Sequence, residues 1–199
     1  SLDISGDAVS ISTWINLNQL PSSMIDSYGP IYDSDQDSYI LYLDKANAEL
    51  RFKVKDVSGD IERPGIPESY LSTGTWLHIA GVYNGHNVMI YLNGTLIDYH
   101  SNSNLDDLQL GQIAEIGRNN GSYFSGKLDE IKIYNRALSP NEVQNLFNEN
   151  YNLCLDTSII EVHLDSIGIS VSNNIEACDS INININQNNS FLSVINFEG

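Results

Sequence analysis

Residues 113–151, IAEIGRNNGSYFSGKLDEIKIYNRALSPNEVQNLFNENY, contain the clearest structural signals in the chain. They predict extended segments, a tight turn and then one short amphipathic helix. Ser139 is the predicted N-cap, Pro140 suits the first helical position, and Glu142 lies where it can complete a capping box. Three apolar side chains then share one helical face: Val143, Leu146 and Phe147.

A second informative stretch is TWLHIAGVYNGHNVMIYLNGTLIDY, residues 75–99. Three apolar runs are separated by Asn84-Gly85 and Asn93-Gly94, and Asn-Gly is a strong signal for a type I′ hairpin turn. On the middle run, Val88, Ile90 and Leu92 share one face, whereas Met89 and Tyr91 share the other. The pattern predicts an antiparallel meander and an all-β protein.

These two stretches resemble the laminin G-like jelly-roll domains of the concanavalin-A-like lectin and glucanase superfamily. The matching motifs are Trp76-x-His78-x-Ala80, Tyr91-x-Asn93-Gly94, Ile116-Gly117-Arg118, Phe124-x-Gly126, Asp129-Glu130 and Tyr134-Asn135-Arg136. The resemblance covers about residues 2–151 and implies a two-sheet antiparallel jelly-roll sandwich. It also implies that Trp14 and Trp76 are core residues and that one further strand precedes Leu2 in a complete domain. Function does not follow, because this fold is found in lectins, adhesins and hydrolases alike.

The composition restricts the possible partners. The chain has 199 residues and a formal net charge of −17, from 26 acidic and 9 basic residues. This balance argues against nucleic acid and anionic membrane surfaces, which need clustered Lys and Arg. No apolar run approaches the ~18 residues of a membrane span. We therefore expect an extracellular, secreted protein that does not insert into membranes and belongs to a larger multidomain chain.

The segment 152–199 is predicted to be a small C-terminal β extension that follows a first domain at residues 1–151. Its residues alternate between apolar and polar, and a hairpin with its turn at Asp165-Ser166 would pair Leu164 with Ile167. The same register brings Cys154 near Cys178. Either a disulfide or two buried thiols fits this pair.

No catalytic pattern is evident in the sequence. The superfamily's β-glucan hydrolases carry carboxylates on one strand at a spacing close to Glu-x-Asp-x-x-Glu, which is missing here. Asp129 and Glu130 are adjacent, so on a regular strand they would point to opposite faces. Neither a zinc-protease motif nor a nucleophile elbow is present, and His78 suits a structural role. We expect a non-enzymatic protein.

Calcium is the predicted cofactor, because acidic oxygens suit this ion. The resemblance implies a structural calcium with Asp129 among its ligands; a hydrogen bond or salt bridge with Arg118 or Arg136 is the alternative. A second candidate is the Asp-x-Asp-x-Asp run of Asp33, Asp35 and Asp37. A solvated hairpin loop is the alternative for that run.

The best candidate ligand surface is a polar and aromatic loop. Asn119, Asn120 and Tyr123 lie in GRNNGSYF, and Tyr32 lies beside another predicted loop. Amides and aromatic faces are suited to carbohydrate, although a loop tyrosine can equally anchor a strand end. The expected function is recognition of glycans or cell-surface proteins with calcium support. The alternatives are a structural or adhesive spacer and a domain associated with a glycan-active enzyme.

Overall fold

The computed structural model describes residues 6–34, 38–105, 107–108, 114–156, 163–165, 168–170, 183–184 and 194–195, with side chains up to residue 149. The chain divides into two compact units, residues 1–148 and 149–199. The predicted boundary at residue 151 and the observed division after residue 148 both fall within the helix at Pro140–Asp156. In the described part of the chain, no helix combines the length and apolar character of a membrane span.

The first unit contains two antiparallel sheets, as predicted. Sheet A consists of β1 (Val9–Leu17), β7 (Trp76–Tyr83), β8 (Asn87–Leu92), β9 (Thr95–Ser101) and β13 (Gly126–Tyr134). Its spatial order is β13-β1-β7-β8-β9, so the first and last strands of the unit are neighbours. Strands β7, β8 and β9 form the predicted meander.

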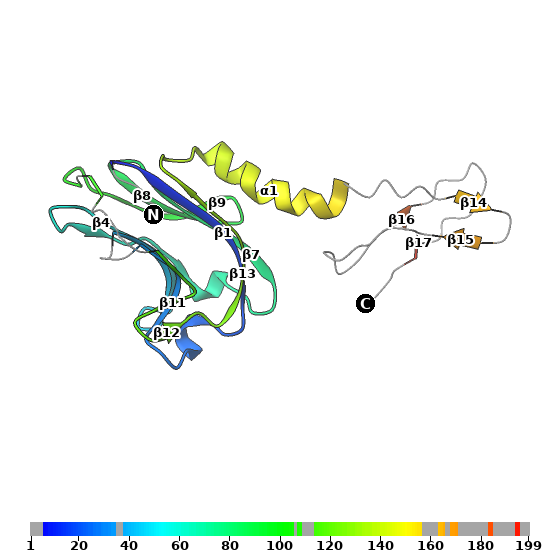
Figure 1. Ribbon diagram of the computed structural model, residues 1–199, viewed down its shortest axis with the longest axis horizontal. Helices are drawn as coiled ribbons and strands as arrows, with labels where there is room; N and C mark the ends of the chain where they lie inside the picture. Colours follow the sequence, from blue (N-terminus) through cyan, green and yellow to red (C-terminus); the bar gives the residue numbers. More distant parts are fainter. Residues whose placement is uncertain are drawn as a thin grey trace. The chain divides into compact units, whose positions relative to one another are not determined.

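Sheet B lies against sheet A (Figure 1). Its strands are β2 (Tyr28–Asp33), β3 (Tyr39–Asp44), β4 (Glu49–Lys55), β5 (Ile61–Glu62), β6 (Gly65–Pro67) and β10 (Glu115–Ile116). The order is β10-β2-β3-β4-β5, and β6 also pairs with β4. The short elements between the strands are the 3-10 helices η1 (Pro21–Ser23) and η2 (Glu68–Tyr70) and a hairpin of β11 (Arg118–Asn119) and β12 (Ser122–Tyr123).

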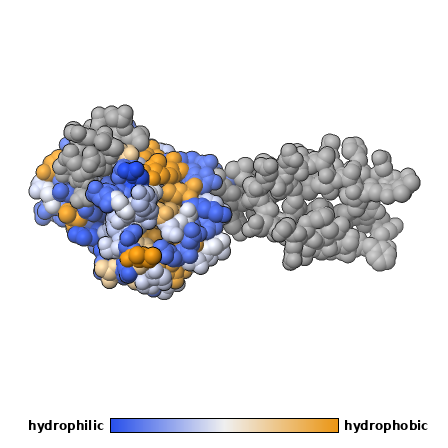
Figure 2. All heavy atoms as spheres, turned by 60° about the horizontal axis from the view of Figure 1, so that its bottom comes forward, coloured by the Kyte–Doolittle hydropathy of each residue, from blue (hydrophilic) through white to orange (hydrophobic). Residues whose placement is uncertain are grey.

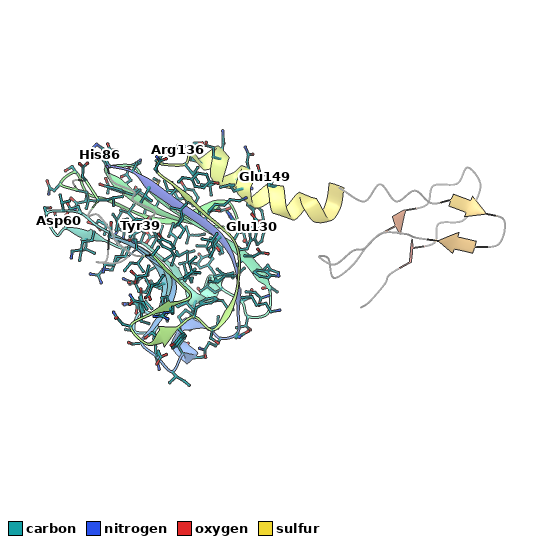
Figure 3. The ribbon with its side chains drawn as sticks, in the orientation of Figure 1. Tyr39, Asp60, His86, Glu130, Arg136 and Glu149 are labelled. Atoms are coloured by element: carbon teal, nitrogen blue, oxygen red, sulfur yellow. The ribbon has the colours of Figure 1, made fainter. Side chains whose placement is uncertain are left out.

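The main core lies between the two sheets. Alternate residues of each strand point into it, including Val88, Ile90 and Leu92 of β8 as predicted. Figure 3 shows Tyr39 among these inward-facing side chains. The sheets approach closely at Gly81, where an added Cβ would lie 2.4 Å from the Phe52 ring. A glycine here lets the ring of sheet B pack on the backbone of sheet A.

The helix α1 (Pro140–Asp156) covers part of the outer face of sheet A. The predicted capping box is present: the Ser139 N–H donates to Glu142 at 2.8 Å, and the Glu142 N–H donates to the Ser139 hydroxyl at 3.3 Å. A small second core forms below the helix. It consists of Ala80, Val82, Tyr91, Leu138 and Val143, with Met89 and Leu146 packed against it.

The two Asn-Gly sequences form different turns. Asn93 and Gly94 have φ angles of 49° and 77°, as the predicted type I′ turn requires. The Asn84-Gly85 connection is longer, because β8 begins only at Asn87. There the Asn84 side chain accepts hydrogen bonds from two following backbone N–H groups. The type I′ prediction is therefore wrong for this turn.

The two tryptophans do not lie in the main core, which corrects the prediction from the resemblance. Trp14 is partly buried on the outer face of sheet A, where its ring stacks on Phe147 of α1 at a centroid distance of 5.8 Å. Trp76 is 43% exposed. It lies on β7 two residues before His78, so it shares the outer face of sheet A.

The second unit contains two short hairpins after the end of α1. They pair β14 (His163–Asp165) with β15 (Gly168–Ser170) and β16 (Ile183–Asn184) with β17 (Val194–Ile195). The first hairpin was predicted, but Leu164 pairs with Ile169 instead of Ile167. Cys154 lies in α1 instead of the predicted extension of the hairpin, and Cys178 lies outside the described residues.

Candidate functional site

The outer face of sheet B carries a compact group of aromatic and polar side chains. Tyr28 and Asp33 come from β2, Tyr42 from β3, and Asn119 from the β11–β12 hairpin. We call these four residues the Tyr28 cluster. Two of them, Asp33 and Asn119, were predicted site residues 86 positions apart in sequence.

A bulge in β2 decides which of its side chains reach this face. Pro30 pairs with Tyr42 of β3, but Tyr32 pairs with the adjacent Leu41, so one extra residue is inserted. The insertion reverses the alternation, and Tyr32 points into the core, where it is 1% exposed and stacks on Tyr39. Tyr32 is therefore a packing residue, which argues against its predicted place in a ligand surface. Asp33 then points outward.

Hydrogen bonds hold the Tyr28 cluster together. The Tyr28 hydroxyl donates to Asp33 Oδ2 at 2.9 Å, and Asn119 Nδ2 donates to the same oxygen. The rings of Tyr28 and Tyr42 lie 4.9 Å apart at an angle of 40°. Asp33 is only 3% exposed, so its carboxylate is fixed by partners instead of by water.

The protonation of the two tyrosines is set by their surroundings. Burial, followed by the charge of Asp33, raises the pKa of Tyr28 above its usual value. Burial and the charge of Asp44 raise the pKa of Tyr42 in the same way, although Arg51 partly opposes this shift. Both phenols therefore stay neutral at physiological pH and keep an O–H donor.

An ion network continues the polar surface along β3 and β4. Arg51 pairs with Glu49 at 2.7 Å and with Asp44 at 3.4 Å. Arg51 lies opposite Tyr42 in the strand register, so the network borders the Tyr28 cluster. Glu49, Asp44 and Arg51 are partly exposed, and together they offer both donors and acceptors beside an aromatic ring.

The β11–β12 hairpin forms the exposed edge of the site. Arg118 pairs with Tyr123, and Asn120 and Gly121 form the turn with φ angles of 46° and 86°. Tyr123 is 63% exposed, in contrast to Asp33 and Tyr42 of the Tyr28 cluster, which are buried. Both strands of the hairpin contact β2. The predicted polar-aromatic loop thus lies beside Asp33, and its exposed part comprises Asn120 and Tyr123.

Asp129 lies on β13 of sheet A, whereas the Tyr28 cluster lies on sheet B. Its carboxylate accepts a hydrogen bond from the Glu130 N–H at 2.8 Å. Glu130 has a φ of 49° at a bulge opposite Thr13, whose hydroxyl donates to the Asp129 carbonyl. Asp129 therefore supports a bulge in β13. The bulge interrupts the regular alternation from which Asp129 and Glu130 were predicted to point to opposite faces. Both side chains are exposed, and Figure 3 shows Glu130 at the outside of the sandwich.

The alternative prediction for Asp129, a bond with Arg118 or Arg136, is wrong, because both arginines pair elsewhere. Arg118 pairs with Glu115 at 3.1 Å, and Arg136 pairs with Glu142 at 2.7 Å. Glu130 pairs instead with Lys132. The Arg136 pair adds to the capping box at the beginning of α1.

Calcium remains a prediction. Asp33 and Asp129 lie on different sheets, and Asp35 and Asp37 lie outside the described residues. Within the described ranges, no three His, Cys, Asp or Glu residues are grouped in a way that could hold a metal ion. Asp33 can offer an oxygen to a cation only in competition with donors that include Tyr28 and Asn119.

His78 has the structural surroundings expected from the sequence. It is 1% exposed beneath α1, and its Nε2 lies 2.8 Å from the Ser12 hydroxyl. Burial, with a smaller effect of Lys132, lowers its pKa to about 4. The ring contacts Trp14 and Phe147, so packing accounts for its position.

Sequence reasoning missed Tyr42 and Arg51 as members of this surface. The signal was present in the alternation of the Tyr39–Leu43 segment, in which every second residue must face away from the core.

The exposed apolar residues of the first unit do not form one obvious alternative site. They include Ile25, Val57, Leu96 and Ile116, which come from different loops and strands. Figure 2 shows one face of the unit, on which the hydrophobic areas are separated by hydrophilic surface.

Comparisons with known proteins identify the family. A laminin G family model described as the concanavalin A-like lectin/glucanases superfamily matches residues 1–144. A mosquitocidal protein of Paraclostridium bifermentans is 27% identical over 157 residues, which cover 71% of this chain and 12% of that protein. The solved binding domain of Paraclostridial Mosquitocidal Protein 1 is similar with a TM-score of 0.58 and 25% identity, covering 76% of this chain and 39% of that chain.

A more distant neighbour shares the fold. The botulinum neurotoxin serotype D binding domain has a TM-score of 0.61 at 17% identity, covering 98% of this chain and 48% of that chain. The present chain thus spans less than half the length of each of these relatives.

Proposed function

This chain belongs to the concanavalin A-like lectin/glucanase superfamily, and we propose that it is a non-catalytic module that recognises carbohydrate or a cell-surface receptor. The proposed binding surface combines the Tyr28 cluster with the exposed β11–β12 hairpin. The observation that carries this proposal is the fixed Asp33 carboxylate, held by Tyr28 and Asn119 next to the Tyr42 ring.

Such an arrangement suits sugars for a physical reason. A sugar presents hydroxyl groups at its edge and apolar C–H groups on its faces. Carboxylates, amides and guanidinium groups form strong hydrogen bonds with hydroxyls, and aromatic rings pack on apolar faces. Because the partners of Asp33 already fix it in place, less ordering is needed when a ligand binds.

Relatives give independent support. The part of the mosquitocidal protein whose structure is similar to this chain is its binding domain. The similar part of the botulinum neurotoxin is also a binding domain. By analogy, we propose that this chain functions outside the cell as one module of a larger protein. A purely structural spacer would not need the polar-aromatic surface on sheet B.

Calcium is part of the proposal as a supporting ion. The exposed Asp129 and the acidic run that begins at Asp33 are the candidate positions. Calcium that binds the native state would raise stability by about 2.7 kcal/mol at a hundredfold excess over its dissociation constant. A thermal melt in chelator and in excess calcium tests this directly, and an unchanged midpoint would remove calcium from the proposal.

A glycan array tests the main proposal. The intact chain is screened with and without a calcium chelator, next to an Asn119→Ala variant whose folding is checked by thermal melting. Binding of a defined glycan by the wild type that the folded variant loses would support the proposed surface. Binding that the variant retains would move the site elsewhere, and no binding to any glycan would favour a protein receptor or a spacer.

A further inference from the structure

The chain contains three Asn-Gly dipeptides among its described residues, at positions 84, 93 and 120. Asn-Gly is chemically prone to spontaneous deamidation, because the glycine N–H can approach the asparagine side chain without hindrance from a Cβ. The local sequence alone gives all three sites a similar intrinsic reactivity. The structure places them in three different environments.

The side chains of Asn84 and Asn93 are held by hydrogen bonds. Asn93 Oδ1 accepts a hydrogen bond from the His78 N–H at 2.9 Å, and the adjacent Gly94 packs against Gln144 of α1. Asn84 Oδ1 accepts hydrogen bonds from two following backbone N–H groups, the shorter at 2.8 Å. The side-chain rotation that the reaction requires must break these bonds.

Asn120 is different in each respect. It is exposed, and its side chain forms no hydrogen bond with the described part of the chain. Gly121 is also exposed, and the space around it is open, with no atom within 4 Å of an added Cβ. The carbonyl carbon of the Asn120 side chain is therefore free to approach the Gly121 nitrogen.

We propose that Asn120 is the preferred site of spontaneous deamidation in the folded chain. The Gly121 backbone nitrogen attacks Cγ of Asn120 and gives up its proton to water. The bond from Cγ to Nδ2 breaks, and ammonia leaves with formation of a succinimide ring. Water then opens either carbonyl of the ring, which produces aspartate or isoaspartate with no other reagent.

The product changes the edge of the Tyr28 cluster. A new negative charge appears next to Asn119, which donates to Asp33, and close in sequence to the exposed Arg118. Isoaspartate also adds a methylene to the backbone of a two-residue turn, so it disturbs the pairing of Arg118 with Tyr123. If the proposed function is correct, this modification alters ligand binding, but the assignment of the reactive site does not depend on that function.

Peptide mapping by mass spectrometry tests the assignment within one molecule. The intact folded chain is incubated in mildly alkaline buffer, and the loss of unmodified Asn is followed at the three dipeptides. We expect Asn120 to react about tenfold faster than Asn93, because breaking a hydrogen bond worth about 1.4 kcal/mol reduces the reactive population by that factor. Asn84 should also lag behind Asn120.

The urea-unfolded chain is the matched control, and an Asn120→Gln variant identifies the modified peptide. In urea, the three dipeptides should react at similar rates, because the hydrogen bonds that separate them are lost. Faster reaction at Asn120 only in the folded chain would support the proposal. Equal rates in the folded chain, or a folded Asn120 that reacts more slowly than Asn93, would overturn it.

Discussion

The outer faces of the two sheets bury polar groups in opposite ways. On sheet A, α1 covers Trp14 and His78, and the buried Trp14 Nε1 and His78 Nδ1 have no hydrogen-bond partner among the described residues. On sheet B, the buried Asp33 carboxylate receives hydrogen bonds from Tyr28 and Asn119. The covered face therefore leaves two buried nitrogens unpaired beneath packed rings, whereas the other face holds its buried carboxylate in a hydrogen-bonded group beside an exposed hairpin.

This difference separates residues that support folding from residues that can support recognition. A buried polar atom without a partner costs free energy, so the packing of α1 must more than compensate for it. A satisfied polar network costs little and supports the exposed hairpin beside it, whose Asn120 and Tyr123 are open to a ligand. Substitutions on the two faces should therefore have different consequences, and each experiment below tests one part of this division.

The largest expected effect is at Trp14. Trp14→Ala should lower the free energy of unfolding by about 3 to 5 kcal/mol, the usual range for a large aromatic side chain removed from a packed site. Its ring stacks on Phe147, so the loss also weakens the attachment of α1. Trp76→Ala is the matched control, because Trp76 is exposed on the same face. Substitutions of surface residues usually have small effects, so we expect Trp76→Ala to lower the free energy of unfolding by less than about 1 kcal/mol. Urea denaturation measures both, and equal losses would contradict the assignment of the packed face.

The next effect is an acid sensitivity caused by His78. Its pKa is about 4 in the folded chain against 6.5 for the ordinary side chain, so the unfolded state binds more protons between these values. Stability should therefore fall as the pH is lowered from 6.5 toward 4, by up to about 3 kcal/mol in total. The surroundings offer the protonated ring no compensating acid, since Ser12, Trp14 and Phe147 contact it and Lys132 opposes its charge.

A His78→Gln variant isolates this effect from the titration of the carboxylates. The difference in unfolding free energy between wild type and variant should shrink or reverse as the pH falls through this interval. The other three histidines are present in both proteins, so their contributions cancel in the difference. A difference that stays constant with pH would mean that His78 is not buried in its neutral form.

The comparison of the two faces also explains what the sequence could predict. Two local signals were confirmed, the capping box at Ser139 and the type I′ turn at Asn93, because they depend on neighbouring residues alone. The same Asn-Gly signal was wrong at Asn84, where the connection is longer. The alternation along β8 was also confirmed, because it too depends on neighbouring residues alone. These signals were enough for the sandwich and its single helix.

The errors came from effects that alternation cannot show. The bulge in β2 turned Tyr32 into the core, and the one in β13 left both Asp129 and Glu130 exposed. Trp76 was assigned to the core from the resemblance, but it lies on the outer face of sheet A. The Tyr28 cluster joins segments that are distant in sequence, so only the three-dimensional pairing of β2 with the hairpin could bring Asn119 to Asp33.

A smaller effect is expected at the beginning of α1. Ser139→Ala should lower the free energy of unfolding by about 1 kcal/mol, because the N-cap hydroxyl accepts a hydrogen bond from the Glu142 N–H. Ser103→Ala, an exposed position outside any helix cap, is the control and should leave stability unchanged. Thermal melts of both variants make the comparison. If Ser139→Ala were neutral, the helix would be held by packing on sheet A alone.

The smallest effect on folding is expected at the exposed edge of sheet B. Tyr123→Ala should change the free energy of unfolding by no more than about 0.5 kcal/mol, because the ring is 63% exposed. Tyr99→Ala is a close control, since Tyr99 is 59% exposed on β9 of the other sheet.

If the hairpin contacts the ligand, Tyr123→Ala should weaken binding about tenfold, the consequence of losing roughly 1.4 kcal/mol of aromatic contact. Tyr99→Ala should bind like the wild type. Titration of both variants with a glycan found on the array decides the matter: equal affinities would remove the hairpin from the binding surface, whereas a loss confined to Tyr123→Ala would separate recognition on sheet B from stability on sheet A.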